Sequence, residues 1–284
     1  MIYIISPKNA AALKKSLGLA KKNISAEILQ RLPKGYKPQK DDQIFIDISG
    51  LDKERFAAAL EWTKEKADSS GTDGSAGSAN VSSSEKRKRP KLAAGKFSGW
   101  KSVRSGTTGS FFFLFVSLSG KTNLRAMLGE AGFTALKNRL REVLQQSFAE
   151  ADALLWMETE GNNLLLIPPK ASNGRAAVEA ALKMILNSPL IVIEKLELSI
   201  PAELTFALHY GQTIYQAPGK TGKVISESVN YIFHLGTKRA ETGRLTISED
   251  VPDEVIPKGL QNIFVPAGVF EGIPVNQSKR FVYK

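Results

Sequence analysis

The sequence predicts an α+β protein, in which a main domain at 110–284 is preceded by a small α/β domain and a disordered linker. Two observations lead to this prediction. An uncharged run rich in Phe and Val, residues 111–118, is typical of a strand buried on both faces. Together with the apolar patterns after it, this run gives the order β-α-α-β-β-α-β-β-α-β, which predicts a mostly antiparallel sheet with helices on one or both faces.

Composition excludes several classes of protein. The chain of 284 residues is 42% hydrophobic, which is enough for a core, and it has room for one large or two small domains. Without cysteine it has no disulfides and no cysteine-built zinc site, and His209 and His234 alone cannot make a His-rich metal site. No run of 18 apolar residues occurs, and the apolar start is too short for a signal peptide, so we expect a cytoplasmic protein.

Positive charge is concentrated in the first part of the chain. Residues 1–66 hold 13 basic and 8 acidic residues, residues 67–110 hold 8 and 3, and residues 111–284 hold 18 and 17. The main domain is therefore nearly neutral, although the whole chain carries a net charge of +11. Attraction to polyanions is expected from the first 110 residues.

Residues 1–66 are predicted to form the small α/β domain. Short apolar runs predict strands at 2–5 and 44–48. Helical spacing, closed by Pro and Gly, predicts a helix at 24–32, and Asp52 is placed to cap another. Together these elements make about half of a doubly wound domain, which we interpret as a docking or dimerisation unit.

Residues 67–109 are predicted to be a flexible, basic linker. The small polar residues at 69–84 cannot bury enough apolar surface to order the chain. The basic run from Lys86 to Arg89 can touch nucleic acid or an anionic membrane, and a solubilising charge cluster also explains it. Trp100 is one aromatic residue among lysines and arginines, which makes a poor base-stacking surface, so we expect it to fold back onto the main domain.

The remaining elements of the main domain follow from apolar spacing and from turn residues. In chain order, helices are expected at 124–128 and 133–148, strands at 153–158 and 163–167, a helix at 176–186, strands at 204–210 and 213–216, a helix at 229–235 and a strand at 244–247. A Ser-Gly turn should start the first helix near Thr122. Gly161 and Asn162 should supply the hairpin turn, and Gly211 should end its strand.

Several residues could carry chemistry. The carboxyl end of a buried central strand is the usual place for a site in α/β proteins, and here that end carries Ser117, a neutral hydroxyl. His209 lies within a strand pattern and is expected to be satisfied by its neighbours. The segment Gly-Lys-Thr-Gly at 219–222 lacks the spacing and strand context of a phosphate-binding loop, so we interpret it as a turn.

Five segments of the main domain share a pattern with one known family. They are Phe-Val-Ser-Leu-Ser-Gly-Lys-Thr at 115–122, Glu-Gly-Asn-Asn-Leu-Leu-Leu-Ile-Pro at 160–168, Phe-Ala-Leu-His-Tyr-Gly at 206–211, Ser-Val-Asn-Tyr-Ile-Phe-His-Leu at 228–235 and Leu-Thr-Ile-Ser at 245–248. In this order they resemble the catalytic domain of class III adenylate and guanylate cyclases. The resemblance covers about residues 110–255 and implies a ferredoxin-like cyclase-homology domain.

The resemblance also implies what a working site contains. In the family, the ribose 3′-hydroxyl attacks the α-phosphate of a nucleoside triphosphate. Two divalent ions, held by two aspartates, activate the hydroxyl and neutralise the phosphates. An Asn and an Arg from the partner chain of a head-to-tail dimer stabilise the transferring phosphorus, and further side chains read the purine.

By this resemblance the sequence departs from the family at nearly every such position. The two metal aspartates fall on Ser117 and Asn162, and the arginine falls on His234. Neutral Ser and Asn cannot replace carboxylates as ligands of hard cations, so we expect no catalytic residues, no metal and no cofactor. A vestigial nucleotide cleft would be formed by the metal positions, the purine-reading positions and the retained asparagine: Ser117, Glu158, Asn162, Lys223 and Asn230.

We therefore expect a catalytically inactive cyclase-homology protein. It would act as a signalling, dimerisation or nucleotide-sensing module, as a homodimer or with a cyclase-like partner chain. One alternative is a divergent, active cyclase that makes cyclic AMP or cyclic GMP with Mg²⁺ or Mn²⁺, with Glu158 or Glu160 recruited as a ligand and His234 charged at mildly acidic pH. Another is a binder of nucleic acid or an anionic membrane through Lys86 to Arg89.

Overall fold

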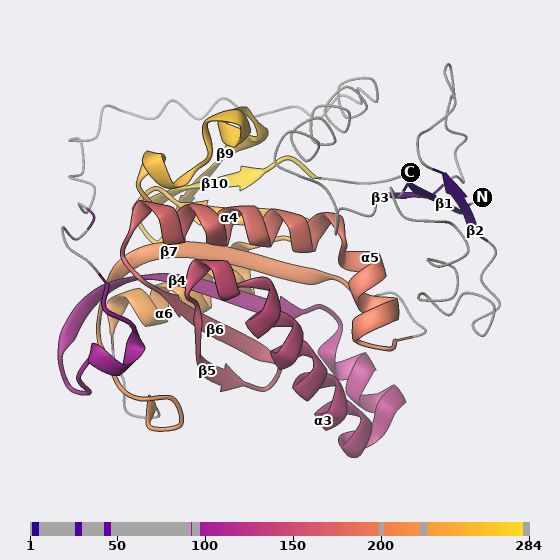
Figure 1. Ribbon diagram of the computed structural model, residues 1–284, viewed down its shortest axis with the longest axis horizontal. Coiled ribbons are helices and arrows are strands. Elements are labelled where there is room, and N and C mark those ends of the chain that lie inside the picture. Colours follow the sequence, from indigo (N-terminus) through magenta and orange to yellow (C-terminus); the bar gives the residue numbers. More distant parts are fainter. Residues whose placement is uncertain are drawn as a thin grey trace.

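The computed structural model describes Leu92 and residues 97–198, 202–221 and 226–280, together with the backbone of three short strands near the N-terminus. The main part is one seven-stranded sheet with helices on both faces (Figure 1). The predicted α+β fold with a mostly antiparallel sheet is therefore confirmed. The basic run from Lys86 to Arg89 lies outside the described residues.

The three N-terminal strands form a small parallel sheet. They are β1 (Ile2–Ile5), β2 (Ala26–Leu29) and β3 (Gln43–Ile46), in the order β2-β1-β3. The strand predicted at 2–5 is present, and the one predicted at 44–48 begins and ends slightly earlier. The prediction of a helix at 24–32 is wrong at its centre, where β2 lies. A short apolar run has too few residues to distinguish the helical period of 3.6 residues from the strand period of two.

The main sheet is built around one long antiparallel pair. Its strands β4 (Thr108–Leu118) and β7 (Leu204–Ile214) pair along 11 residues. The sheet order is β5-β6-β4-β7-β8-β10-β9, and β7 with β8 is the one parallel pair in it. The other strands are β5 (Leu154–Thr159), β6 (Asn162–Ile167), β8 (Leu245–Ser248), β9 (Phe264–Phe270) and β10 (Ile273–Ser278).

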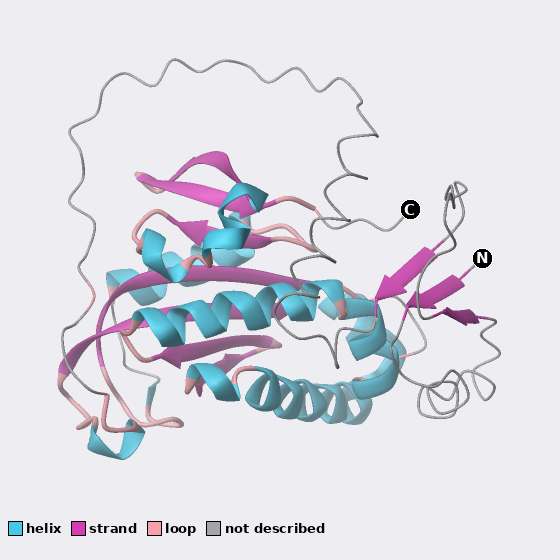
Figure 2. Ribbon diagram, turned by 45° about the horizontal axis from the view of Figure 1, so that its top comes forward, coloured by secondary structure: helices cyan, strands magenta, loops and turns pink. Residues whose placement is uncertain are grey.

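Three helices account for most of the helical residues described. Helix α3 (Lys121–Ser147) has a break at Gly129, where φ is 68° and ψ is 174°, so the predicted pair of helices in this region is confirmed. Helix α4 (Ala171–Leu186) leads into the short α5 (Ser188–Leu190) and a π-helical turn (Ile191–Lys195). Helix α6 (Glu227–His234) continues as a second π-helical turn (Leu235–Arg239). Figure 2 shows the long helices α3 and α4 beside the layer of strands.

Alternate residues of β4 face two different cores. Phe112, Leu114 and Val116 point to the core that lies under α3 and α4. Phe113 and Phe115 point to the other core, under α6, which we call the α6 face of the sheet. Because Ser117 has the same parity as Phe113 and Phe115, its side chain belongs to the α6 face.

The segment before β4 packs on the main domain. Trp100, in a 3₁₀ turn (Trp100–Ser102), donates a hydrogen bond from Nε1 to the carbonyl of Asp152 at 2.7 Å. Its ring stacks on Phe111 and Tyr215, with centroid distances of 5.9 and 6.1 Å. The expectation that Trp100 folds back onto the main domain is confirmed.

Two parts of the sheet differ from the prediction. Strand β7 continues through Gly211, so the strands predicted at 204–210 and 213–216 are one. Gly211 is needed there for close approach, because a Cβ atom would collide with the side chain of Ser228 at the start of α6. The hairpin of β9 and β10 was not predicted, although Glu271 and Gly272 between the strands have φ of 47° and 79°, the geometry of a type I′ turn.

Among the described residues, no single helix is both long and apolar enough to cross a membrane. Helix α4 and the segment Ser188–Lys195 are long and apolar enough only when they are taken together, and the chain bends between them. Nine residues of α4 are buried, which is typical of a core helix.

Gly236 offers a test of packing on the α6 face. A Cβ atom at this position would overlap the ring of Phe115, which is fully buried. We expect Gly236→Ala to lower the free energy of unfolding by about 1–3 kcal/mol, because overpacking forces side chains and backbone apart. Urea unfolding followed by circular dichroism measures this. The control is Gly259→Ala, since a Cβ atom there meets nothing within 4 Å, and an equal loss in both variants would contradict the prediction.

Candidate functional site

The structure brings Ser117 and Asn162 together at one end of the sheet. The two residues are directly opposite each other in the antiparallel pair of β4 and β6, so their side chains share the α6 face. Ser117 is 8% exposed, and its Oγ lies 3.3 Å from the carbonyl oxygen of Leu118, to which it donates. Neither of these two positions, 117 and 162, is an aspartate.

The turn next to these residues is not the predicted one. Glu160 and Gly161 form it, with φ of 43° and 85°, which is the type I′ geometry of a two-residue hairpin. Asn162 is the first residue of β6, and Asn163 after it is buried. The two asparagines are therefore strand residues, and the interpretation of Asn162 as a turn residue is wrong.

Lys121 occupies the space in front of Asn162. It is the first residue of α3, and its Nζ donates a hydrogen bond to Oδ1 of Asn162 at 2.5 Å. Its aliphatic stem lies against the hairpin turn, because a Cβ atom on Gly161 would be 2.9 Å from Cδ of Lys121. Burial lowers the pKa of the ammonium group, and the nearby charge of Glu160 partly opposes this.

These side chains do not fit a pair of divalent cations. The donors are one hydroxyl and one amide, and the amide oxygen already accepts from an ammonium group. Hard cations such as Mg²⁺ require several oxygen ligands, usually with carboxylates among them. Within the part of the chain that the structure describes, no group of three or more His, Cys, Asp or Glu side chains could hold a metal ion.

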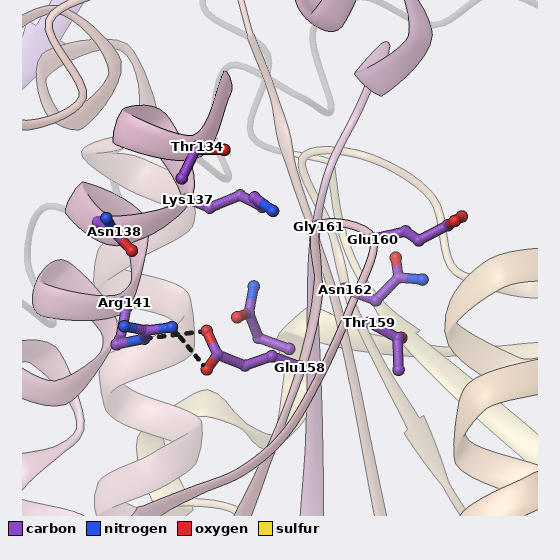
Figure 3. Close-up of a pocket in the computed structure, with 10 residues that line it drawn as sticks. Thr134, Lys137, Asn138, Arg141, Glu158, Thr159, Glu160, Gly161 and Asn162 are labelled. Carbon is purple, nitrogen blue, oxygen red and sulfur yellow. Dashed lines mark hydrogen bonds and ion pairs between the residues drawn. The ribbon is translucent and has the colours of Figure 1, made fainter. Parts of the chain in front are cut away.

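Glu158 is held by a helix instead of facing the predicted cleft. Arg141 of α3 donates to both of its carboxylate oxygens, from Nε at 3.1 Å and from a terminal nitrogen at 2.9 Å. This hydrogen bonding raises the pKa of Arg141. Figure 3 shows Glu158 pointing toward α3, whereas Glu160 and Asn162 point away from it. Glu158 and Asn162 are therefore near each other on the hairpin, but their side chains point in opposite directions.

Arg141 and Glu158 line a small pocket between α3 and the hairpin. Its volume is about 210 Å³. Its lining comes from one face of α3 and from the hairpin residues: Thr134, Lys137, Asn138, Arg141 and 158–163 (Figure 3). The pocket is too small for a nucleoside triphosphate, because ligand pockets usually have 300–1,000 Å³.

Asn230 and His234 lie at the other end of the α6 face. They are four residues apart on α6, so they share one side of the helix. His234 Nδ1 is 2.8 Å from a carboxylate oxygen of Glu271. Both residues of α6 line a pocket of about 650 Å³ whose rim includes Ser110 of β4.

The two groups of predicted site residues are thus separated within one chain. Ser110 and Ser117 are seven residues apart on β4, which corresponds to about 23 Å along a strand. Ser117 and Asn162 lie at one end, and the pocket of Asn230 and His234 lies at the other. Lys223 is outside the described residues, so its predicted place in the cleft stays a prediction.

His209 is a structural residue. It is 3% exposed, and its Nδ1 lies 2.8 Å from Oγ of Ser248. Its ring packs between Phe113 and Tyr231, with centroid distances of 6.2 and 4.6 Å. The expectation of a strand histidine satisfied by its neighbours is confirmed.

Sequence reasoning missed three residues that define these sites: Lys121, Arg141 and Glu271. The signal for Lys121 was its place at the start of a helix, where the helix dipole disfavours a cation and a compensating partner is needed. Arg141 and Glu271 reach their partners across 17 and 37 residues of sequence. Neither contact leaves a local pattern.

Comparison with known proteins gives results only at the level of structure. No protein-family model matches the sequence, and no curated protein matches it. The solved structures that are similar include the guanylyl cyclase Cya2, with 14% identity, a TM-score of 0.48 and coverage of 62% of this chain and 94% of that one. The adenylyl cyclase CyaB from P. aeruginosa has 16% identity, a TM-score of 0.48 and coverage of 61% and 94%.

A third similar structure is the guanylate cyclase domain of RhGC from Catenaria anguillulae, solved in complex with GTP. It has 13% identity, a TM-score of 0.48 and coverage of 61% of this chain and 98% of that one. All three similar structures are cyclases or cyclase domains, the family that the sequence resembles. What this site can do chemically depends on the side chains of this chain and not on those of the similar structures.

Lys121 predicts a specific pH dependence of stability. Because burial lowers its folded-state pKa below 10.5, the unfolded chain binds more protons between the two values, and stability rises with pH there. In Lys121→Met this contribution is absent. We expect the difference in free energy of unfolding between the wild type and the variant to move in favour of the wild type as pH rises toward 10.5.

Urea unfolding of both proteins between pH 7 and pH 10 measures this difference. Lys137→Met is the control. Lys137 also belongs to α3 and lies beside the hairpin, where it lines the small pocket. The prediction would be contradicted if the free energies of unfolding of the wild type and of Lys121→Met differed by the same amount at every pH in this range.

Proposed function

We propose that the main domain is a cyclase-like domain that does not cyclise nucleotides and that acts in signalling as a binding and dimerisation module. The contact between Lys121 Nζ and Asn162 Oδ1, 2.5 Å long, carries this proposal. By the sequence resemblance, Asn162 stands where the family has a metal-binding aspartate. A fixed ammonium group replaces the cation there, and a neutral amide replaces the anion.

Electrostatics supports the loss of two-metal chemistry. Two divalent ions between Ser117 and Asn162 would lack both carboxylates and would lie close to a positive charge on Lys121. At a separation of about 4 Å in a partly buried site, one unit charge repels another by several kcal/mol, and a divalent ion doubles this. Without the ions, the neutral side chains of Ser117 and Asn162 cannot activate a ribose hydroxyl or offset the charge of a triphosphate.

The acids that a divergent cyclase would recruit are engaged in other interactions. Glu158 is paired through both oxygens with Arg141 and points toward α3. Glu160 lies in the hairpin turn, where its charge acts on Lys121. The active-cyclase alternative therefore needs Glu158 to leave Arg141. Binding of nucleic acid or of a membrane by Lys86 to Arg89 stays a separate prediction.

The proposed loss of activity predicts a negative enzyme assay. The purified full-length chain, incubated with ATP or GTP and with Mg²⁺ or Mn²⁺, should form no cyclic nucleotide above a blank without protein. Detection is by mass spectrometry of the reaction mixture. Product above the blank that disappears in Asn230→Ala would contradict the proposal, because Asn230 is the residue that the resemblance retains.

Restoring charge should restore metal binding. We expect the triple variant Ser117→Asp, Asn162→Asp and Lys121→Met to bind Mn²⁺ at least tenfold more tightly than the wild type, because two carboxylates then face each other without the ammonium group. Titration followed by electron paramagnetic resonance of free Mn²⁺ measures this. The matched control is Lys121→Met alone, and wild-type binding as tight as that of the triple variant would refute the charge argument.

A further inference from the structure

The small pocket between α3 and the hairpin of β5 and β6 is lined almost entirely by polar residues. Its helical side is a stripe of polar side chains, spaced by three or four residues along one face of α3: Thr134, Lys137, Asn138 and Arg141. Its other side is formed by residues 158–163 of the hairpin. The pocket is separate from the α6 face, because α3 packs on the opposite face of the sheet.

Asn163 brings a buried amide to this pocket. It is directly opposite Val116 in the pair of β4 and β6, and Val116 belongs to the core under α3 and α4, so the side chain of Asn163 points to that face. Asn163 is only 4% exposed and lines the pocket. Within the described part of the chain, its side-chain amide has no hydrogen-bond partner. Buried amides normally have a partner, and a group bound in the pocket would supply one.

Lys137 brings a positive charge to the same space. Its Nζ lies 5.7 Å from the centroid of the Phe133 ring, and Figure 3 shows the side chain pointing from α3 toward the hairpin. Among the residues that the structure describes, no carboxylate forms an ion pair with it. The side chains of Thr134 and Asn138, on the same face of α3, also have no hydrogen-bond partner among those residues. These groups are therefore available to a ligand.

The two acids that line the pocket leave this charge in place. Glu158 is neutralised by Arg141, which donates to both of its carboxylate oxygens. Glu160 points away from α3, and its charge acts on Lys121. The pocket therefore keeps one positive charge, that of Lys137, and favours an anion.

The size and the donors of the pocket indicate which anion. A volume of about 210 Å³ equals the share of about seven water molecules in the liquid, so only a compact group fits. A planar carboxylate is best matched by a bidentate guanidinium group, and that of Arg141 is already engaged with Glu158. The remaining donors come from different directions, Lys137 from the helix and Asn163 from the sheet. Such an arrangement suits a tetrahedral oxyanion, because each oxygen can accept from its own donor.

We propose that this pocket binds inorganic phosphate, with Lys137 as the charged donor and the amide of Asn163 as the buried donor. The site goes beyond the proposed function, since it requires neither a nucleotide nor a metal ion. It also lies on the other face of β6 from Asn162, because successive side chains of a strand point to opposite faces. Whether the cleft on the α6 face is active or inactive does not change this site.

Isothermal titration calorimetry of the full-length chain with sodium phosphate, at an ionic strength kept constant with sodium chloride, measures the binding. We expect Lys137→Met to raise the dissociation constant by about tenfold or more, because it removes a charge-assisted hydrogen bond. Asn163→Asp should abolish binding, because it places a carboxylate against the anion.

Lys258→Met and Asn276→Asp are the matched controls. They make the same changes of charge at positions that do not line the pocket, and they should leave the dissociation constant within about twofold. Urea unfolding without phosphate shows which variants are folded. Lys137 is only half-buried, so Lys137→Met tests the site even where Asn163→Asp does not fold.

Two further ligands distinguish phosphate from other carriers of the same chemistry. Acetate is planar and O-phosphoserine is larger than the pocket, so each should bind at least about tenfold more weakly than phosphate. Phosphate should also raise the urea midpoint of the wild type, because a ligand that binds only the native state stabilises it. The assignment would be overturned by a wild type without saturable binding, by acetate or O-phosphoserine that binds as tightly as phosphate, or by Lys137→Met that binds like the wild type.

Discussion

The burial of β4 on both faces is the constraint on which the rest of the structure depends. From Phe111 to Leu118 each residue of this strand is less than 9% exposed, so an unpaired charge along it would be costly. Charged groups are therefore confined to its two ends. One end receives Lys121 from the next helix, and the other opens into the pocket that Asn230 and His234 line. The separation of the two sites by about the length of the buried strand follows from this constraint.

Elements with long apolar patterns could be predicted from the sequence, and elements defined by distant partners could not. The β4 strand, the broken α3 and the α6 helix were predicted because their own residues carry the period. The strand β2 was predicted as a helix, since four residues are too few for a period. The β9–β10 hairpin was missed because its Glu-Gly turn was not recognised, although the same pair of residues forms the turn before Asn162.

The candidate site shows the same division. The absence of aspartate at Ser117 and Asn162 could be read directly, and the family resemblance predicted that the two residues share one cleft. Their direct pairing is known from the structure. The role of Lys121 depends on how the start of α3 lies against the hairpin, which no spacing encodes. Glu158 was assigned to the cleft by the family resemblance, as a purine-reading position, but the strand pairing places it opposite Asn163, on the side of Arg141. A shift of one residue along a strand changes the face of the side chain.

The neutral residues at the metal positions are consistent with a stable site that holds no ion. Two carboxylates at directly opposed positions, with Cβ atoms roughly 5 Å apart, repel each other unless cations lie between them. Ser117 and Asn162 remove this repulsion, and the amide of Asn162 gives the lysine a partner at a helix start where the helix dipole disfavours a positive charge. The side chains therefore satisfy one another without a metal. A site that satisfies itself in this way keeps its geometry when no nucleotide is bound, and geometry is what pairing with another protein surface requires.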